Sequence, residues 1–158
     1  MSQPSYRQNA FIRPSRYALK PSLGLSLLLL CACSGSPPAN LGLQAGRLAP
    51  CPQSPNCVSS QAGDAEHRVE PLPLVGSPEQ TQMRLLAILA SEPRARLVQQ
   101  DGRYLRAEFT SRVLRFVDDV EFLIGEQAVE VRSASRLGYA DFGVNRDRVE
   151  RLRRRLGE

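Results

Sequence analysis

From Arg96 to Arg132 apolar and polar side chains alternate along the chain, which is typical of strands that bury one face of a sheet. Asp101-Gly102 and Gly125-Glu126 interrupt this alternation with residues that tight turns favour. The pattern predicts an antiparallel meander of about four strands, apolar on one face and charged on the other. On the charged face, which we expect to be exposed, lie Arg106, Glu108, Asp119, Glu121, Glu130 and Arg132.

Two further segments, one on each side of the meander, carry apolar residues at helical spacing. A capping box that begins at Ser77 predicts a helix over residues 78–91. A second helix is predicted over residues 146–156, with Asn145 as its N-cap. We therefore predict an α+β fold in which both helices pack on one face of the meander.

Residues 1–32 have the pattern of a secretory signal peptide. The segment is basic and free of Asp and Glu, and small residues follow its apolar run from Leu23 to Leu30. This run is too short to cross a bilayer, because a spanning helix needs ~20 apolar residues. We therefore expect residues 1–32 to be removed during export.

Leu30-Cys31-Ala32-Cys33 resembles a bacterial lipobox, in which the last cysteine is lipidated and becomes the first residue of the mature protein. Cys31 is the alternative acceptor, but Cys33 fits better because a small residue precedes it. Fatty acyl chains such as palmitate would hold the protein on a membrane, since each buried CH₂ contributes ~0.8 kcal/mol. Ser34 stands where an Asp would resemble the inner-membrane retention signal, so we expect the outer membrane, with the domain facing the periplasm.

Cleavage changes the charge of the chain, which is +5 before export. Four of the 21 Lys and Arg residues precede residue 33 and all 16 acids follow it, so the mature chain carries 17 bases. A nearly neutral domain gives no reason to expect nucleic acid as a partner. Residues 33–50 are rich in Gly, Pro and Ala, which predicts a flexible tether, and residues 51–158 suit one domain.

Cys51 and Cys57 enclose a short segment that contains two prolines. In an exported protein these cysteines are expected to form a disulfide. A redox pair and a metal site are the alternatives. The spacing differs from the Cys-x-x-Cys of redox centres, and the single His67 would bring a metal site to three ligands where structural zinc takes four. We expect neither a metal nor a cofactor.

Three longer motifs carry a resemblance to a known family. They are CPQSPNCVSS at residues 51–60, FVDDVEF at residues 116–122 and RSASRLGYADFGVNR at residues 132–146. In this order they resemble the domain of unknown function 1499 family, which occurs in bacterial lipoproteins and small exported proteins. The resemblance covers about residues 48–156 and implies that the disulfide segment and the loop at 132–146 belong to one domain. It implies no activity, substrate or catalytic residue.

The loop at 132–146 is the candidate binding site, because loops carry function more often than the elements they connect. Its Arg, Ser and Asn side chains could donate hydrogen bonds to an anionic small ligand or contact an envelope protein. The alternative is that its arginines are already paired with nearby acids. The candidate residues are Arg132, Ser133, Ser135, Arg136, Tyr139, Asp141, Asn145 and Arg146.

The sequence favours a lipid-anchored envelope protein whose domain is a non-catalytic binding or interaction module. No serine has an evident base beside it, since His67 lies in a segment broken by prolines. One alternative is an envelope hydrolase that uses Asp119, Glu121 or Asp141 as acid or base. Another is a purely structural envelope component. Nothing in the sequence indicates an oligomeric state.

Overall fold

The structure, a computed structural model, describes residues 35–158, which belong to one compact unit. The predicted signal peptide at 1–32 and the predicted lipid acceptor Cys33 lie outside the described residues. Among the residues that are described, no helix has both the length and the apolar character that a membrane span requires.

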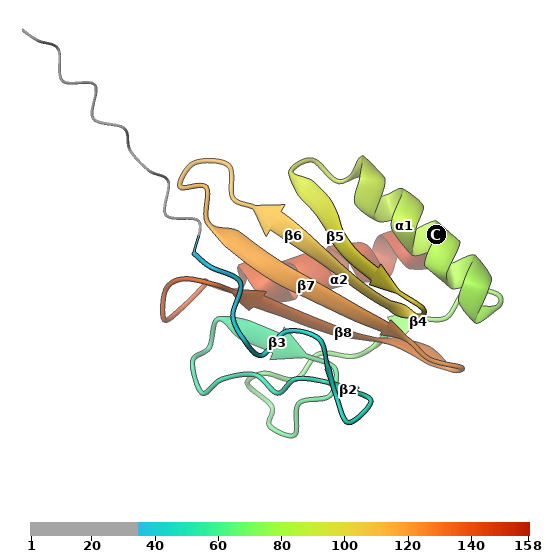
Figure 1. The fold of residues 1–158 in the computed structure, drawn as a ribbon, viewed down its shortest axis with the longest axis horizontal. Coiled ribbons are helices and arrows are strands. Elements are labelled where there is room, and N and C mark those ends of the chain that lie inside the picture. The colour runs from blue at the N-terminus through green and yellow to red at the C-terminus, as the bar shows by residue number, and fades with distance from the viewer. Residues whose placement is uncertain (1–34) are drawn as a thin grey trace, which may run out of the picture. The chain divides into compact units, whose positions relative to one another are not determined.

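The fold is α+β, as predicted, and its main sheet has six strands in which every pairing is antiparallel (Figure 1). Four of them form the predicted meander in chain order. Two short strands outside the predicted meander, β3 and β4, pair with the outer edge of β8. The sequence allows at most an edge strand within residues 66–75, where β4 lies, and β3 has too few residues to show an alternation. The strands are β3 (Cys57–Ser59), β4 (Leu72–Pro73), β5 (Ala95–Asp101), β6 (Tyr104–Thr110), β7 (Val117–Ile124) and β8 (Ala128–Ser135).

Helix α1 spans Pro78–Ser91 and begins with the capping box that the sequence predicts at Ser77. Helix α2 spans Val144–Gly157, so it starts earlier than expected, and its N-cap is Gly143. The prediction of Asn145 as the N-cap is therefore wrong. The Asp141 carboxylate accepts the backbone N–H groups of Gly143 (3.2 Å) and Asn145 (2.7 Å), so these two amides are satisfied from outside the helix.

Both helices lie on one side of the sheet and enclose the hydrophobic core (Figure 1). Leu85 and Leu89 of α1 and Leu152 and Leu156 of α2 are buried in it. The sheet supplies apolar side chains from alternate positions, as the period of two requires. These are Leu105, Ala107, Phe109, Val120, Phe122, Ile124, Val129 and Val131.

The opposite face of the sheet is covered by the segment that precedes β3. Strands β1 (Leu43–Gln44) and β2 (Arg47–Leu48) form a small hairpin, and β2 contacts β7 and β8. Leu48 and Ala49 are buried. Residues 42–49, which the composition placed in a tether, are therefore joined to the domain.

This cover also changes the environment of the charged residues. The sequence predicts an exposed charged face, but Asp119, Glu121 and Arg132 are buried. The prediction of exposure was wrong for these three residues because the covering segment excludes water from them. We call this side of the sheet the covered face, with the side chains of Tyr104, Arg106, Glu108, Asp119, Glu121 and Arg132.

Candidate functional site

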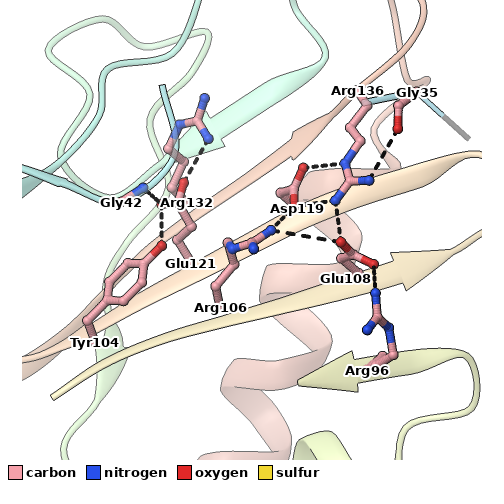
Figure 2. Close-up of polar contacts among 10 residues, drawn as sticks. All are labelled: Gly35, Gly42, Arg96, Tyr104, Arg106, Glu108, Asp119, Glu121, Arg132 and Arg136. Atoms are coloured by element: carbon pink, nitrogen blue, oxygen red, sulfur yellow. Dashed lines mark hydrogen bonds and ion pairs between the residues drawn. The ribbon is translucent and has the colours of Figure 1, made fainter. Parts of the chain in front are cut away.

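The charged residues of the covered face pair across the strands of the meander (Figure 2). In the register of β6 and β7, Glu108 lies opposite Asp119, and Arg106 lies opposite Glu121. In the register of β7 and β8, Glu121 lies opposite Arg132. Charge therefore alternates in sign across three neighbouring strands in the row of Arg106, Glu121 and Arg132. Glu108 and Asp119, by contrast, are two acids that face each other and need cations from outside their own pair.

Arg136, which directly follows β8, holds two acids from two different strands. Its Nε and Nη2 donate to the two carboxylate oxygens of Asp119 at 2.7 and 2.9 Å, and Nη2 also donates to Glu108 at 2.5 Å. Hydrogen bonds from Arg136 to Asp119 raise the pKa of the guanidinium above its ordinary value. Burial alone would raise the pKa of Glu108, but hydrogen bonds from Arg136 and Arg96 outweigh it and lower that pKa. Glu108 and Arg136 are therefore both ionised at neutral pH.

Glu121 is the second centre of the covered face. Its carboxylate accepts hydrogen bonds from Arg132 Nη1 at 2.9 Å, from the Tyr104 hydroxyl at 2.8 Å and from the Gly42 backbone N–H at 2.7 Å (Figure 2). Burial raises the pKa of Tyr104, and the hydrogen bond to Glu121 raises it further, so the phenol stays protonated. Glu121 thus ties the covering segment to the sheet.

A third polar cluster lies on the helix side. Arg148 of α2 donates to Asp118 of β7 and to the Ser133 hydroxyl of β8. Asn145 donates through Nδ2 to the Asn56 carbonyl at 3.0 Å and to the Ser135 hydroxyl at 2.9 Å. These contacts join the disulfide segment, the end of β8 and the start of α2, as the three sequence motifs imply.

The disulfide segment, residues 51–60, makes contacts that hold the fold together. Cys51 and Cys57 form the predicted disulfide, with their Cα atoms 5.6 Å apart. The His67 ring contacts Asp64 at 2.7 Å and the Ser54 carbonyl at 3.3 Å. Burial lowers the pKa of His67, but hydrogen bonds to Asp64 and Ser54 reverse this, and the net shift is upward. Within residues 35–158 no three His, Cys, Asp or Glu side chains are grouped as metal ligands would be.

The eight residues proposed from the sequence do not surround one hollow. Arg132 and Arg136 serve the covered face, whereas Ser133, Ser135 and Asn145 serve the helix side. Asp141 caps α2, and Arg146 donates to the backbone carbonyls of Arg68 and Glu66. Tyr139 is 75% exposed. All three arginines of the candidate set, Arg132, Arg136 and Arg146, are thus already engaged.

The structure shows an exposed apolar surface that the sequence reasoning missed. Residues 111–116 form a loop between β6 and β7, although their apolar run suggested a strand, and Val113 is 82% exposed. Phe142, in the loop between β8 and α2, is 98% exposed. A hollow of about 240 Å³ lies between these two loops. We call this surface the apolar rim, with the side chains of Val113, Leu114, Phe116, Leu137, Tyr139 and Phe142.

A signal for the apolar rim was present in the sequence. The run Arg112-Val-Leu-Arg-Phe116 has no alternation, since two apolar residues stand together between two arginines. Such a run does not fit a strand with one buried face. The predicted meander includes this run, and an apolar run alone does not tell where the sheet ends.

A family model described as "Protein of unknown function (DUF1499)" matches residues 47–156 of the chain. This is the family that the three sequence motifs resemble. No curated protein and no solved structure matches the chain. The match covers β2, all six strands of the main sheet and both helices except the last residue of α2.

Proposed function

The chain belongs to the DUF1499 family, and we propose that it is a lipid-anchored cell-envelope protein whose domain is a non-catalytic binding or interaction module. The observation that carries the proposal is the ion-pair network of the covered face. Asp119 is held by Arg106 and Arg136, and Glu121 is held by Arg132. A carboxylate that works as acid or base needs access to its substrate, and these two side chains have almost none.

The lipid anchor is proposed from the lipobox at residues 30–33. The outer membrane, with the domain in the periplasm, is the location that Ser34 favours. Contacts of the first described residues support an anchor close to the domain. Arg136 Nη1 donates to the Gly35 carbonyl at 3.3 Å, and Glu121 holds the Gly42 amide. The chain that leads to Cys33 thus starts from a fixed point on the domain.

The anchor is tested by replacing each cysteine of the lipobox in turn. Cys33→Ala should abolish lipid attachment and release the protein from the membrane fraction, while the matched control Cys31→Ala should leave both unchanged. Mass analysis of the mature protein measures the lipid directly. A mature chain that carries no lipid would reject the anchor, and a lipidated chain that begins at Cys31 would move the acceptor to that residue.

The non-catalytic role is tested by a broad hydrolytic screen of the mature protein. We expect no substrate turnover that depends on Asp119, Glu121 or Asp141, the three acids of the hydrolase alternative. Asp141 is the most accessible of them, and it is occupied by the two amides that begin α2. Turnover that disappears in Asp141→Asn, while the variant unfolds at the same urea concentration as the parent, would show a hydrolase instead.

A further inference from the structure

The apolar rim takes no part in the polar networks described above, and its two loops lie at the same end of the sheet (Figure 1). Soluble domains seldom gather large exposed apolar side chains in one place unless something binds there. We propose that the apolar rim inserts into the interface of the membrane that carries the protein's own lipid anchor. This inference rests on the lipid anchor of the proposed function and names the bilayer as what the domain binds.

The position of the chain at Gly35 supports the bilayer as the occupant. The Gly35 carbonyl accepts a hydrogen bond from Arg136 Nη1 at 3.3 Å, so the first described residue lies beside the loop that follows β8. It approaches Leu137 of the apolar rim so closely that a Cβ on Gly35 would lie 3.2 Å from Leu137 Cγ. Two residues of chain span at most about 7 Å, so Cys33 cannot be farther than this from Gly35. A lipid on Cys33 therefore enters the membrane beside the apolar rim.

The charge of the loop at 111–116 suits a lipid surface. Arg112 and Arg115 are exposed and flank the apolar pair Val113 and Leu114, and no acid occurs in this loop. Segments that lie in the membrane interface combine apolar side chains that enter it with basic side chains that meet the phosphates. Tyr139 adds an amphipathic ring of the kind that is enriched at this depth. The nearby Asp141 carboxylate is already bound to backbone amides.

The backbone at the tips of both loops is strained. Arg115 has φ 59° and Phe142 has φ 55°, and they are two of the four non-glycine residues with positive φ in the described part of the chain. Bulky side chains rarely adopt this conformation, and such strain persists mainly at functional sites. Packing inside the domain does not explain Phe142, because its side chain is almost fully exposed. Insertion into a bilayer gives the exposed ring a contact.

Insertion of the rim would orient the domain, while the lipid supplies most of the affinity. Because Gly35 and Gly42 are held by Arg136 and Glu121, the domain has little chain with which to move away from the bilayer. The covered face and the helices would then stand at a fixed angle to the membrane. The opposite end, with the turns at 101–103 and 125–127, would point away from it.

The chain contains no Trp, so one introduced Trp reports its own environment without background. We would place Phe142→Trp and Val113→Trp separately in the full chain, with Met83→Trp on exposed α1 as the matched control. Each mature protein is reconstituted into vesicles of zwitterionic or anionic lipid, with and without bromine on the acyl chains. The Phe142→Trp and Val113→Trp proteins should shift to shorter emission wavelength and lose roughly half or more of their emission to bromine, whereas Met83→Trp should not.

Equal and weak quenching of all three reporters would overturn the inference. Quenching should be stronger in anionic vesicles and should weaken when Arg112 and Arg115 are both replaced with Ala. A wavelength shift in native membranes with no quenching in pure lipid would show a protein partner at the apolar rim and would also overturn it.

Mass analysis of the same preparations separates this inference from the proposed anchor. Lipid on Cys33 together with unquenched reporters rejects membrane insertion and leaves the anchor intact. A chain without lipid rejects the anchor, and the reporters then decide the inference alone when that chain is mixed with the same vesicles. Quenching would support insertion, and unquenched emission would reject it.

Discussion

Glu121 and Phe122 are neighbours on β7, both are fully buried, and they point to opposite faces of the sheet. Phe122 lies among apolar side chains, whose attraction is non-directional and follows the area removed from water. Glu121 lies among an arginine, a phenol and a backbone amide, each at hydrogen-bond distance. The comparison teaches that equal burial places different demands on the two faces. On the helix side a substitution must preserve the buried volume. On the covered face it must preserve every hydrogen-bond and ion-pair partner.

The largest effect should come from Glu121→Gln, although it changes the size of the side chain very little. The variant leaves the Arg132 charge buried without its counter-charge, which destabilises a fold by about 3–5 kcal/mol. Urea unfolding of the mature protein measures the change. The control is Glu126→Gln, which removes an exposed pair with Arg103 and should change the stability far less, because solvent screens that pair.

A combined variant sharpens this first prediction. When Glu121 and Arg132 are both replaced with Met, and Tyr104 with Phe, no buried charge is left without a partner. Most of the lost stability should return, because the penalty comes from the uncompensated group rather than from a strong net attraction. A triple variant less stable than Glu121→Gln would show that the ion pair itself stabilises the domain.

The apolar face should behave in the opposite way. Leu105 is fully buried, and Leu105→Ala should destabilise the domain by about 3 kcal/mol through lost burial and the cavity that remains. Leu105→Met, which keeps the volume, should cost less than about 1.5 kcal/mol. The same urea titrations measure both variants. If Leu105→Met were as costly as Glu121→Gln, the distinction between the two faces would fail.

The contrast also explains what the sequence could predict of the fold. Helix α1 and the meander of β5 to β8 follow from local signals, a capping box at Ser77 and a period of two, and both are confirmed. The cover over the charged face was not predictable in this way. Residues 42–49 have the composition of a tether, and the contact from Gly42 to Glu121 is made by a backbone amide, which every non-proline residue possesses.

The candidate site shows the same limit. The loop at 132–146 does meet the disulfide segment, through Asn56 and Asn145, as the order of the motifs implied. The partners of Arg136 and Arg146 come from distant strands and carbonyls, so the sequence left open whether these arginines were free. The apolar rim was missed because exposure depends on where the sheet ends, and the apolar run at 113–117 crosses that end.

The disulfide joins Cys51, which follows the cover, to Cys57 of β3 at the edge of the sheet, so its removal should affect the two faces unequally. Closing a ring of seven residues lowers the entropy of the unfolded chain by an amount worth about 2 kcal/mol. Replacing Cys51 and Cys57 together with Ser should therefore lower stability by about 2 kcal/mol. Hydrogen exchange should increase first at Leu48 and Ala49, which belong to the cover and are separated from the ring by Pro50 alone, and later in the core of α2. Uniform exchange across both faces would contradict this order.

The smallest effect should come from acid, and on the covered face it should act through Glu108. The folded pKa of Glu108 is lowered from 4.5 because hydrogen bonds from Arg136 and Arg96 outweigh its burial. A carboxyl with a depressed folded pKa stabilises the fold fully above its unfolded pKa and loses this contribution as pH falls through the folded value. The contribution of Glu108 to the stability should therefore stay constant around neutral pH, and it should decline below about pH 4.5.

Glu108→Gln tests this acid dependence directly. The variant should start from a lower stability at pH 7, because Arg136 and Arg96 lose a charged partner. It should then lose less stability than the parent between neutral pH and the acid range, since the amide does not titrate. Phe109, the next residue on β6, faces the core, so Phe109→Leu should lower the whole stability curve without changing its slope with pH. Parallel curves for Glu108→Gln and the parent would mean that the ion pairs of the covered face do not set the acid limit of the domain.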